Sequence, residues 1–224
     1  SFHQHNQQQR IPELLQALAD GEALALISDA GLPGISDPGE ELVAAARAAG
    51  HMVICIPGPC AATTALVSSG LPSGRFCFEG FLPAKGRERQ QRLADLAKEE
   101  RTSVLYEAPH RLLQLLKELS EHCGAERPVQ VARELTKRHE QQVGPTLAAA
   151  LEHFMACKPQ GECTVVLGGA PASEPEAWDT DSLRQQLQQL QDDGLSASDA
   201  ARELASRSGH SRRELYALLH GTAD

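Results

Sequence analysis

The sequence predicts an α/β protein that ends in a small all-α module, and two observations carry this prediction. Over residues 23–167, apolar runs rich in β-forming residues alternate with helical patterns, which is typical of α/β folds with largely parallel sheets. After Leu167, a stretch rich in Gly, Pro and Ala is followed by three short helical patterns with no further strand pattern.

Each expected element rests on its local pattern. Strands are expected at six apolar runs, residues 23–28, 51–57, 75–81, 103–107, 128–133 and 162–167. Helices are expected at residues 8–20, 40–49, 60–69, 86–99, 110–122 and 146–156, and in the tail at 180–193, 196–208 and 211–220. Ser196 and Ser211 are expected N-caps, and Gly194 and Gly209 lie at the breaks between the tail helices.

Composition and charge limit the classes of function. The chain has 224 residues, 41% of them hydrophobic, and no apolar run of membrane-spanning length. Its formal net charge of −9 argues against general adhesion to nucleic acid or anionic membranes, but it leaves room for a local basic patch. The six cysteines form no CxxC pair, so we expect free thiols in a reducing cytoplasm and no metal site.

The longest irregular connection follows the first expected strand. Residues 28–39 hold three glycines and two prolines, and a second turn, Pro57-Gly58-Pro59, follows the second expected strand. In a parallel sheet both loops would leave at the carboxyl edge, where ligands bind. The glycine spacing fits neither GxGxxG nor a P-loop. The first loop is therefore either a ligand site, with Asp29 at the strand end, or a long structural turn.

Cys60 and a basic segment each have a functional and an ordinary interpretation. Cys60 opens a helix, where the dipole lowers a thiol pKa, but no base can be assigned to it. A small residue packed beside a ligand is the preferred interpretation. The segment 85–92 holds four basic residues and one acidic residue, and it either contacts phosphates or forms a solvated helix face.

Polar clusters follow two later strands. VLYEAPHRL, residues 104–112, places Glu107 and His110 at a strand-to-helix junction. VARELTKRHE, residues 131–140, does the same with Glu134 and Lys137. Helix caps and surface charge would explain either cluster alone, but the repeated position at strand ends favours a second lining for a cleft.

Five motifs occur in an order that points to a known family. They are SDAGLPGISDPG, PGPCAATTAL, FEGFLPAKGRER, LYEAPHRL and ARELTKRHE. Together they resemble the 16S ribosomal RNA (cytidine-2′-O)-methyltransferases of the tetrapyrrole methylase superfamily, over essentially the whole chain. The resemblance implies a two-domain α/β enzyme that binds S-adenosylmethionine in the cleft between its domains. It also implies a homodimer and a cytidine substrate in the decoding region of the small ribosomal subunit.

The resemblance also assigns site residues. The opening loop matches the cofactor loop of the superfamily, so the expected cofactor contacts are Ser28, Asp29, Ala30, Gly31, Leu32, Pro33, Gly34, Cys60, Ala61, Glu107 and Leu135. The family usually has Ser at the position of Cys60, and since both residues are small we expect a minor effect. Expected RNA contacts are Lys85, Arg87, Arg89 and Arg92 in the basic segment, with Arg212 and Arg213 in the tail.

The front of the chain departs from the family pattern. The family begins with a strand and a loop resembling ATPIGN, then an AEDTR-like segment, whereas this chain opens with SFHQHN, which resembles the later SYHEHN. We therefore expect an incomplete N-terminal cofactor-binding domain over residues 1–72, a second α/β domain over 73–169, a linker over 170–179 and a helical module over 180–224. We also expect tight cofactor binding to require an N-terminal extension.

Methyl transfer to a ribose hydroxyl needs alignment and a base. The sulfonium already activates the methyl group, so the enzyme must align oxygen, carbon and sulfur and assist loss of the hydroxyl proton. Location makes Glu107, His110, Glu134 and Lys137 candidate bases, and the sequence does not choose among them. Two other functions stay open: methylation of a tetrapyrrole or corrin, and a non-catalytic role in RNA binding or assembly.

Overall fold

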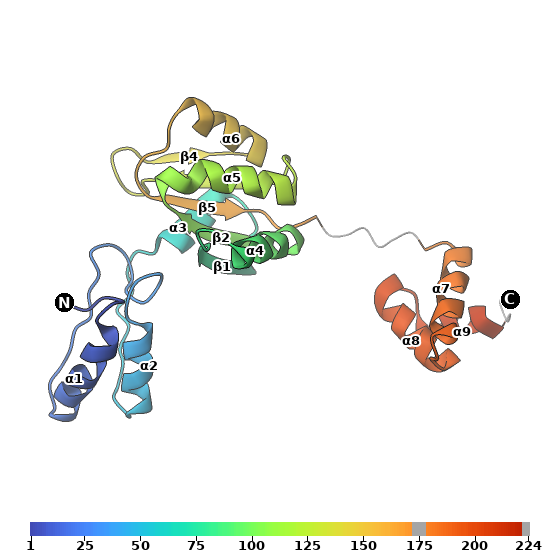
Figure 1. The fold of residues 1–224 in the computed structure, drawn as a ribbon, viewed down its shortest axis with the longest axis horizontal. Coiled ribbons are helices and arrows are strands. Elements are labelled where there is room, and N and C mark those ends of the chain that lie inside the picture. The colour runs from blue at the N-terminus through green and yellow to red at the C-terminus, as the bar shows by residue number, and fades with distance from the viewer. Residues whose placement is uncertain (172–177, 221–224) are drawn as a thin grey trace. The chain divides into compact units, whose positions relative to one another are not determined.

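The computed structural model describes residues 1–171 and 178–220, in two compact units, Ser1–Ala170 and Pro171–Asp224 (Figure 1). The expected linker over residues 170–179 lies largely outside the described residues. Among the helices that the structure describes, none is both long and apolar enough to cross a membrane.

A five-stranded mixed sheet forms the centre of the first unit, in the order β1-β2-β5-β3-β4 (Figure 1). The strands are β1 Phe76–Phe81, β2 Thr102–Glu107, β3 Val129–Arg133, β4 Gln141–Val143 and β5 Cys163–Leu167. Only β1 and β2 are parallel, and the other neighbouring pairs are antiparallel. The expectation of a largely parallel sheet is therefore wrong, because a residue pattern indicates where a strand lies but not its direction.

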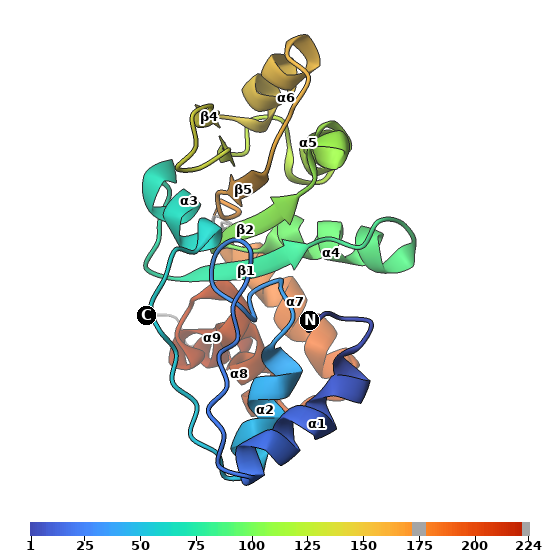
Figure 2. The ribbon, with the colours of Figure 1, turned by 90° about the vertical axis from the view of Figure 1, so that its left-hand side faces the viewer.

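Helices cover both faces of this sheet. Figure 2 shows α3 Ala61–Ser69 on one side of the strands, and α4 Arg87–Lys98 and α5 Pro109–Cys123 on the other. Together with α6 Leu147–Ala156, α4 and α5 bury the larger core against alternate strand residues such as Leu105, Val131 and Val165. The smaller core joins α3 to the intervening residues Val104, Ala132 and Val166. This alternation follows from the two-residue period of a strand.

The N-terminal segment contains two helices and no strand. α1 Gln7–Ala19 and α2 Glu40–Ala48 lie side by side, and the Gln7 side-chain amide donates to Glu41 at 2.8 Å. The strands expected at residues 23–28 and 51–57 are wrong: neither segment has a ladder partner in the described part of the chain. Ile27 is 86% exposed and Ile56 75% exposed. Apolar composition alone cannot supply the neighbour that a strand needs.

One buried arginine ties the elements of the first unit together. Arg127 Nε donates to the carbonyl oxygen of Gly168 at 2.6 Å, and Nη2 donates to the carbonyl oxygens of Leu96 and Glu99, each at 3.2 Å. These last two carbonyls lie at the C-terminal end of α4, where helix carbonyls lack intrahelical partners. Burial lowers the pKa of the Arg127 guanidinium, although the nearby Cys123 acts in the opposite direction.

The second unit is a three-helix bundle with well-formed N-caps. It contains α7 Thr180–Asp192, α8 Ala197–Ser208 and α9 Arg212–His220, and its core is built from leucines and alanines of all three helices. Ser196 caps α8 by accepting from the backbone of Asp199. Ser211 and Glu214 exchange hydrogen bonds of 3.0 and 3.2 Å in a reciprocal capping box. Both expected serine caps are confirmed.

We expect Arg127→Leu to lower the free energy of unfolding of the first unit by about 2–4 kcal/mol, because it leaves several buried carbonyl groups without a donor. Arg101→Leu is the matched control: Arg101 is 43% exposed and pairs with Glu99 on the surface, so its loss should lower the free energy of unfolding much less. Urea unfolding followed by circular dichroism compares the two. Equal losses in both variants would show that the Arg127 contacts contribute no special stability.

Candidate functional site

The Gly/Pro loop is held in shape by its own polar contacts. Ser28 Oγ donates to Asp37 Oδ2 at 2.7 Å and accepts from the backbone N–H of Ala30 at 3.3 Å. Gly39 precedes α2 with φ +147°, and a Cβ there would lie 2.7 Å from a methyl of Leu26. Asp29 is exposed, and within the described residues its carboxylate has no hydrogen bond or ion pair. It is therefore available to a ligand.

Two other segments approach this loop. A Cβ added to Gly31 would lie 3.5 Å from the carbonyl oxygen of Pro59, so the loop adjoins the Pro57-Gly58-Pro59 turn. A Cβ added to Gly80 in β1 would lie 3.4 Å from Ser36 Oγ. The two Gly/Pro loops thus meet, but not at the edge of a shared parallel sheet, because the segments before them form no strands. The rest of the expected loop contacts, Ala30, Leu32, Pro33 and Gly34, lie in the same turn of chain.

Cys60 lies at the start of α3, beside Tyr106 of β2. The backbone N–H of Ala62 donates to the Tyr106 hydroxyl at 3.1 Å. Burial acts to raise the pKa of the Cys60 thiol, but hydrogen bonds from Thr63, Ala62 and Tyr106 outweigh it and lower the pKa. Burial, followed by the adjacent Cys60 thiolate, raises the pKa of Tyr106 to about 12. The Tyr106 hydroxyl therefore stays protonated at neutral pH.

Leu135, which follows β3, packs against the same small core as Cys60. Cys60, Tyr106 and Leu135 all pack against the small core beneath α3, and Ala61 is exposed at the first helical position. Three of the expected cofactor positions, Cys60, Ala61 and Leu135, thus lie at or against α3. Tyr106 was not among the expected contacts. Strand parity gives the signal that was missed: next to a buried Glu107, Tyr106 must face the opposite side of the sheet.

Glu107 lies on the face of the sheet away from α3. Its side chain is fully buried; Oε1 accepts from the backbone N–H of Ala108 at 2.9 Å and lies 3.1 Å from Nε of Arg111. The second oxygen, Oε2, is buried without a hydrogen-bond partner in the described part of the chain. An unpaired buried carboxylate oxygen is costly, so a donor from water or from a ligand would stabilise this atom. His110 is exposed in the first turn of α5.

Glu134 and Lys137 form a strained, charged loop after β3. Glu134 has φ +52°, a region that side chains rarely adopt outside functional or tightly held sites. Hydrogen bonds from the backbone of Glu162 and from Lys137 lower the pKa of Glu134. Hydrogen bonds to Glu134 and Glu162 raise the pKa of Lys137, whose Nζ lies 3.0 Å from each carboxylate. Both groups are therefore held in their charged forms.

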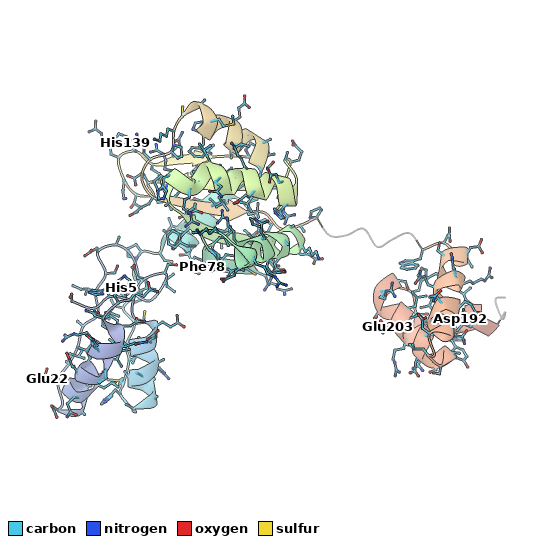
Figure 3. The ribbon with its side chains drawn as sticks, in the orientation of Figure 1. His5, Glu22, Phe78, His139, Asp192 and Glu203 are labelled. Carbon is cyan, nitrogen blue, oxygen red and sulfur yellow. The ribbon has the colours of Figure 1, made fainter. Side chains whose placement is uncertain are left out.

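Two adjoining cavities lie beside this loop. Their volumes are about 360 and 310 Å³, and both are lined by Arg133 and Gln160. His153 and Lys158 line the larger cavity. His139, which is labelled in Figure 3, lines the smaller one. No residue of the Gly/Pro loops lines either cavity, so neither coincides with the expected cofactor contacts. In the described residues no group of His, Cys, Asp and Glu could hold a metal ion.

The basic segment is less available than its composition suggests. Arg89 is buried, with Nε 2.9 Å from Glu118 Oε2 and Nη1 2.8 Å from the carbonyl oxygen of Pro83. Arg92 is paired with Glu79. The burial of Arg89 does not fit the expectation that it contacts RNA. The charge of Arg92 is already neutralised by Glu79, so this side chain is less available to a phosphate. Lys85 and Arg87 are exposed, and neither has an ion pair in the described residues.

The tail arginines are both exposed. Arg212 opens α9 and donates to Ser198 Oγ of α8 at 2.5 Å, which links the two helices. Arg213 follows it with no hydrogen bond or ion pair to the rest of the described chain. The guanidinium groups of this pair therefore lie at the surface, at the turn between α8 and α9.

Comparison with known proteins agrees with this architecture. The family model for Tetrapyrrole (Corrin/Porphyrin) Methylases matches residues 1–151. The methyltransferase CobJ has a similar structure, with a TM-score of 0.55 and 23% identity over 72% of this chain and 70% of that one. A Thermus thermophilus uroporphyrin-III C-methyl transferase, solved with S-adenyl homocysteine, has a TM-score of 0.50 and 21% identity over 73% of each chain.

A curated relative matches the chain more closely. The Ribosomal RNA small subunit methyltransferase I of Synechocystis sp. is 50% identical over 218 residues, which are 97% of this chain and 78% of that protein. A match of this length includes the helical unit as well as the sheet. The chain therefore belongs to the tetrapyrrole methylase family and, within it, to the ribosomal RNA small subunit methyltransferases I.

Proposed function

We propose that this protein uses S-adenosylmethionine to methylate the 2′-hydroxyl of a cytidine in the decoding region of 16S ribosomal RNA. One observation carries the choice of RNA over a tetrapyrrole. The tetrapyrrole methylase model ends at residue 151, whereas the match to a ribosomal RNA methyltransferase spans 97% of the chain. The second unit is thus shared with an RNA-modifying relative, and a small macrocycle does not need it. The rival idea of a non-catalytic RNA-binding protein is tested by methyl transfer itself.

The Gly/Pro loops and the start of α3 are the proposed cofactor site. The loop 28–34 adjoins the Pro57-Gly58-Pro59 turn, and Cys60, Ala61 and Leu135 lie nearby. The exposed carboxylate of Asp29 is suited to accept hydrogen bonds from an amine or a ribose. Support also comes from the Thermus thermophilus neighbour, which holds the product that remains after S-adenosylmethionine has given up its methyl group.

The chain's own residues must position the acceptor oxygen and remove its proton. The bound cofactor supplies an electrophilic methyl group, so alignment is the main task of the protein. Lys137 and Glu134 are weak choices for the base, because their mutual hydrogen bonds stabilise the charged form of each. We retain Glu107, with its unpaired Oε2, and the exposed His110 as the candidate bases.

RNA contact is assigned to the exposed cations. Lys85 and Arg87 follow β1, and Arg212 and Arg213 begin α9 in the helical unit. None of the four has an ion pair with a carboxylate in the described residues, so each can neutralise one phosphate. A homodimer and a cytoplasmic location, where ribosomal subunits are assembled, complete the proposal.

Methyl transfer from labelled S-adenosylmethionine to isolated small ribosomal subunits tests the proposed function directly. We expect labelled 16S RNA in which the modified linkage resists alkaline cleavage, since a 2′-O-methyl group removes the attacking hydroxyl. An N-terminally extended version should be assayed beside the chain. Label on a tetrapyrrole substrate with none on RNA would overturn the proposal, as would a base-methylated product.

We expect Asp29→Ala to weaken S-adenosylmethionine binding at least about tenfold, because it removes a charge-assisted acceptor from the cofactor loop. Calorimetry on the extended protein measures the affinity, and thermal melting shows whether the variant is folded. Glu40→Ala, an exposed carboxylate on the neighbouring helix α2, is the matched control and should bind normally. A folded Asp29→Ala variant with unchanged affinity would remove Asp29 from the site.

We expect replacement of Arg212 and Arg213 by Ala to weaken binding to the small subunit and to lower the salt dependence of binding, by roughly one unit of slope per lost phosphate contact. Cofactor affinity should not change. Arg184→Ala on α7 is the control, because Arg184 is paired with Asp181.

Deletion of the chain after Gly169 should weaken subunit binding further and leave cofactor binding intact. Filter binding across a salt series and light scattering report the two properties. A deletion that converts a dimer to a monomer, with subunit affinity unchanged, would make the helical unit an assembly element.

A further inference from the structure

Aromatic residues are scarce in this chain and half of them gather on one face of the sheet. The sequence has five Phe, two Tyr and one Trp, and four of these eight residues lie on β1 and β2: Phe76, Phe78, Phe81 and Tyr106. Phe78 is 38% exposed and Phe81 53% exposed, although both belong to a strand. Figure 3 marks Phe78 on the edge of the sheet. Phe78, Phe81 and Tyr106 are called the aromatic cluster below.

The aromatic cluster exists because β1 contains a bulge. Phe78 pairs with Val104 and Phe81 pairs with Tyr106, and the register shifts between Phe78 and Gly80, where Gly80 has φ +60°. In a regular strand, residues three apart face opposite sides. The bulge turns Phe81 to the side of Phe78, so both rings contact Tyr106, with centroid distances of 5.2 and 5.6 Å. Bulges that re-aim side chains are common beside active sites.

The cluster adjoins the proposed cofactor site on two sides. The Tyr106 hydroxyl accepts from the backbone N–H of Ala62, the second residue of the helix that Cys60 caps. At the bulge, a Cβ added to Gly80 would lie 3.4 Å from Ser36 in the Gly/Pro loop. A methyl acceptor must sit next to the cofactor. A ring system bound on the cluster would occupy such a position.

Charge in the segment that follows the cluster in the chain favours a nucleic acid as its occupant. Lys85 and Arg87 lie four and six residues after Phe81, are exposed and have no ion pairs in the described chain. The other two cations of the segment are used internally, Arg89 by Glu118 and Arg92 by Glu79. Exposed aromatic rings beside unpaired cations are the combination that holds single-stranded RNA, with bases on the rings and phosphates on the cations.

We propose that Phe78 and Phe81 form a base-stacking site for the RNA substrate, supported by Tyr106 from behind, with Lys85 and Arg87 holding the adjacent phosphates. This rests on the proposed function in naming RNA as the substrate. The stacking site adds to that function the element of RNA that the enzyme recognises. This element is an unpaired base held against β1, next to the methyl donor. Stacking accepts any base, so the cluster fixes the position of the nucleotide rather than its identity.

Affinity for a short single-stranded RNA that contains cytidine tests the stacking site. We expect Phe78→Leu and Phe81→Leu each to weaken RNA binding about tenfold, since one base loses an aromatic partner. Phe81→Tyr, which keeps the ring, should bind like the parent. Both leucine variants should keep the parent's affinity for S-adenosylmethionine and its melting temperature, because the replaced rings are partly exposed.

A fluorescence experiment on the whole chain gives a readout that needs no activity. In a Trp178→Phe background, Phe81→Trp places the only tryptophan in the cluster, and stacking with a base should quench its emission as RNA is added. The parent chain, whose tryptophan lies in the other unit, serves as the control.

Three results would overturn the stacking site. One is unchanged RNA affinity in both leucine variants, and another is an equal loss of cofactor affinity, which would make the cluster part of the cofactor wall. The third is conversion of a dimer to a monomer by Phe81→Leu, which would identify the face as a contact between copies. If the chain binds RNA on the cluster but neither it nor the N-terminally extended version methylates the small subunit, the proposed function fails while the stacking site stands.

Discussion

The central position of β5 is the constraint on which the rest of the first unit depends. All five residues of β5 are buried, and the strand is antiparallel to both of its neighbours. Its first residue, Cys163, lies opposite Glu107 at the end of β2 and opposite Arg133 at the end of β3. The two polar clusters therefore emerge at one edge of the sheet. A slip of one residue would exchange the core faces of β5, so its register is strongly specified.

The sheet separates adjacent residues into different roles. Tyr106 faces α3 and the Gly/Pro loop, whereas Glu107 is buried on the other face beside Arg111. Tyr106 and Glu107 are therefore neighbours in the sequence motif but lie in two different environments. In β1 the bulge at Gly80 has the opposite effect, because it brings Phe78 and Phe81, which a regular strand would place on opposite faces, to one face. The position of the aromatic cluster is a consequence of backbone geometry and not of residue spacing.

Local patterns in the sequence predict local structure here, and they fail where structure depends on a distant partner. The helix caps at Ser196 and Ser211 and the strands around Val104 and Val165 follow from nearby residues. The unpaired segments 23–28 and 51–57 have strand composition but no neighbour, and β4 was missed because Gln141 and Gln142 are polar.

The sequence also could not predict which charged side chains near the site pair with one another. A count of charges cannot show that Arg89 is bound to Glu118. Helical spacing does contain a hint, since Arg89, Leu93 and Leu96 share the buried face of α4. The Gly/Pro loop and the Pro57-Gly58-Pro59 turn were expected to meet at the edge of a parallel sheet. The two loops do lie together, but the segments before them form no strands, so the contact depends on packing between the loops.

The charge balance of the chain decides how it can hold RNA. With a net charge of −9, the protein as a whole repels a polyanion. At physiological salt, charges more than about 8 Å apart are largely screened, so only cations that touch the backbone add affinity. In the basic segment, Arg89 and Arg92 stabilise the fold and leave Lys85 and Arg87 for that task. Contacts that do not depend on salt, such as stacking on Phe78 and Phe81, must then carry a larger share of the affinity than they do in a basic RNA-binding protein.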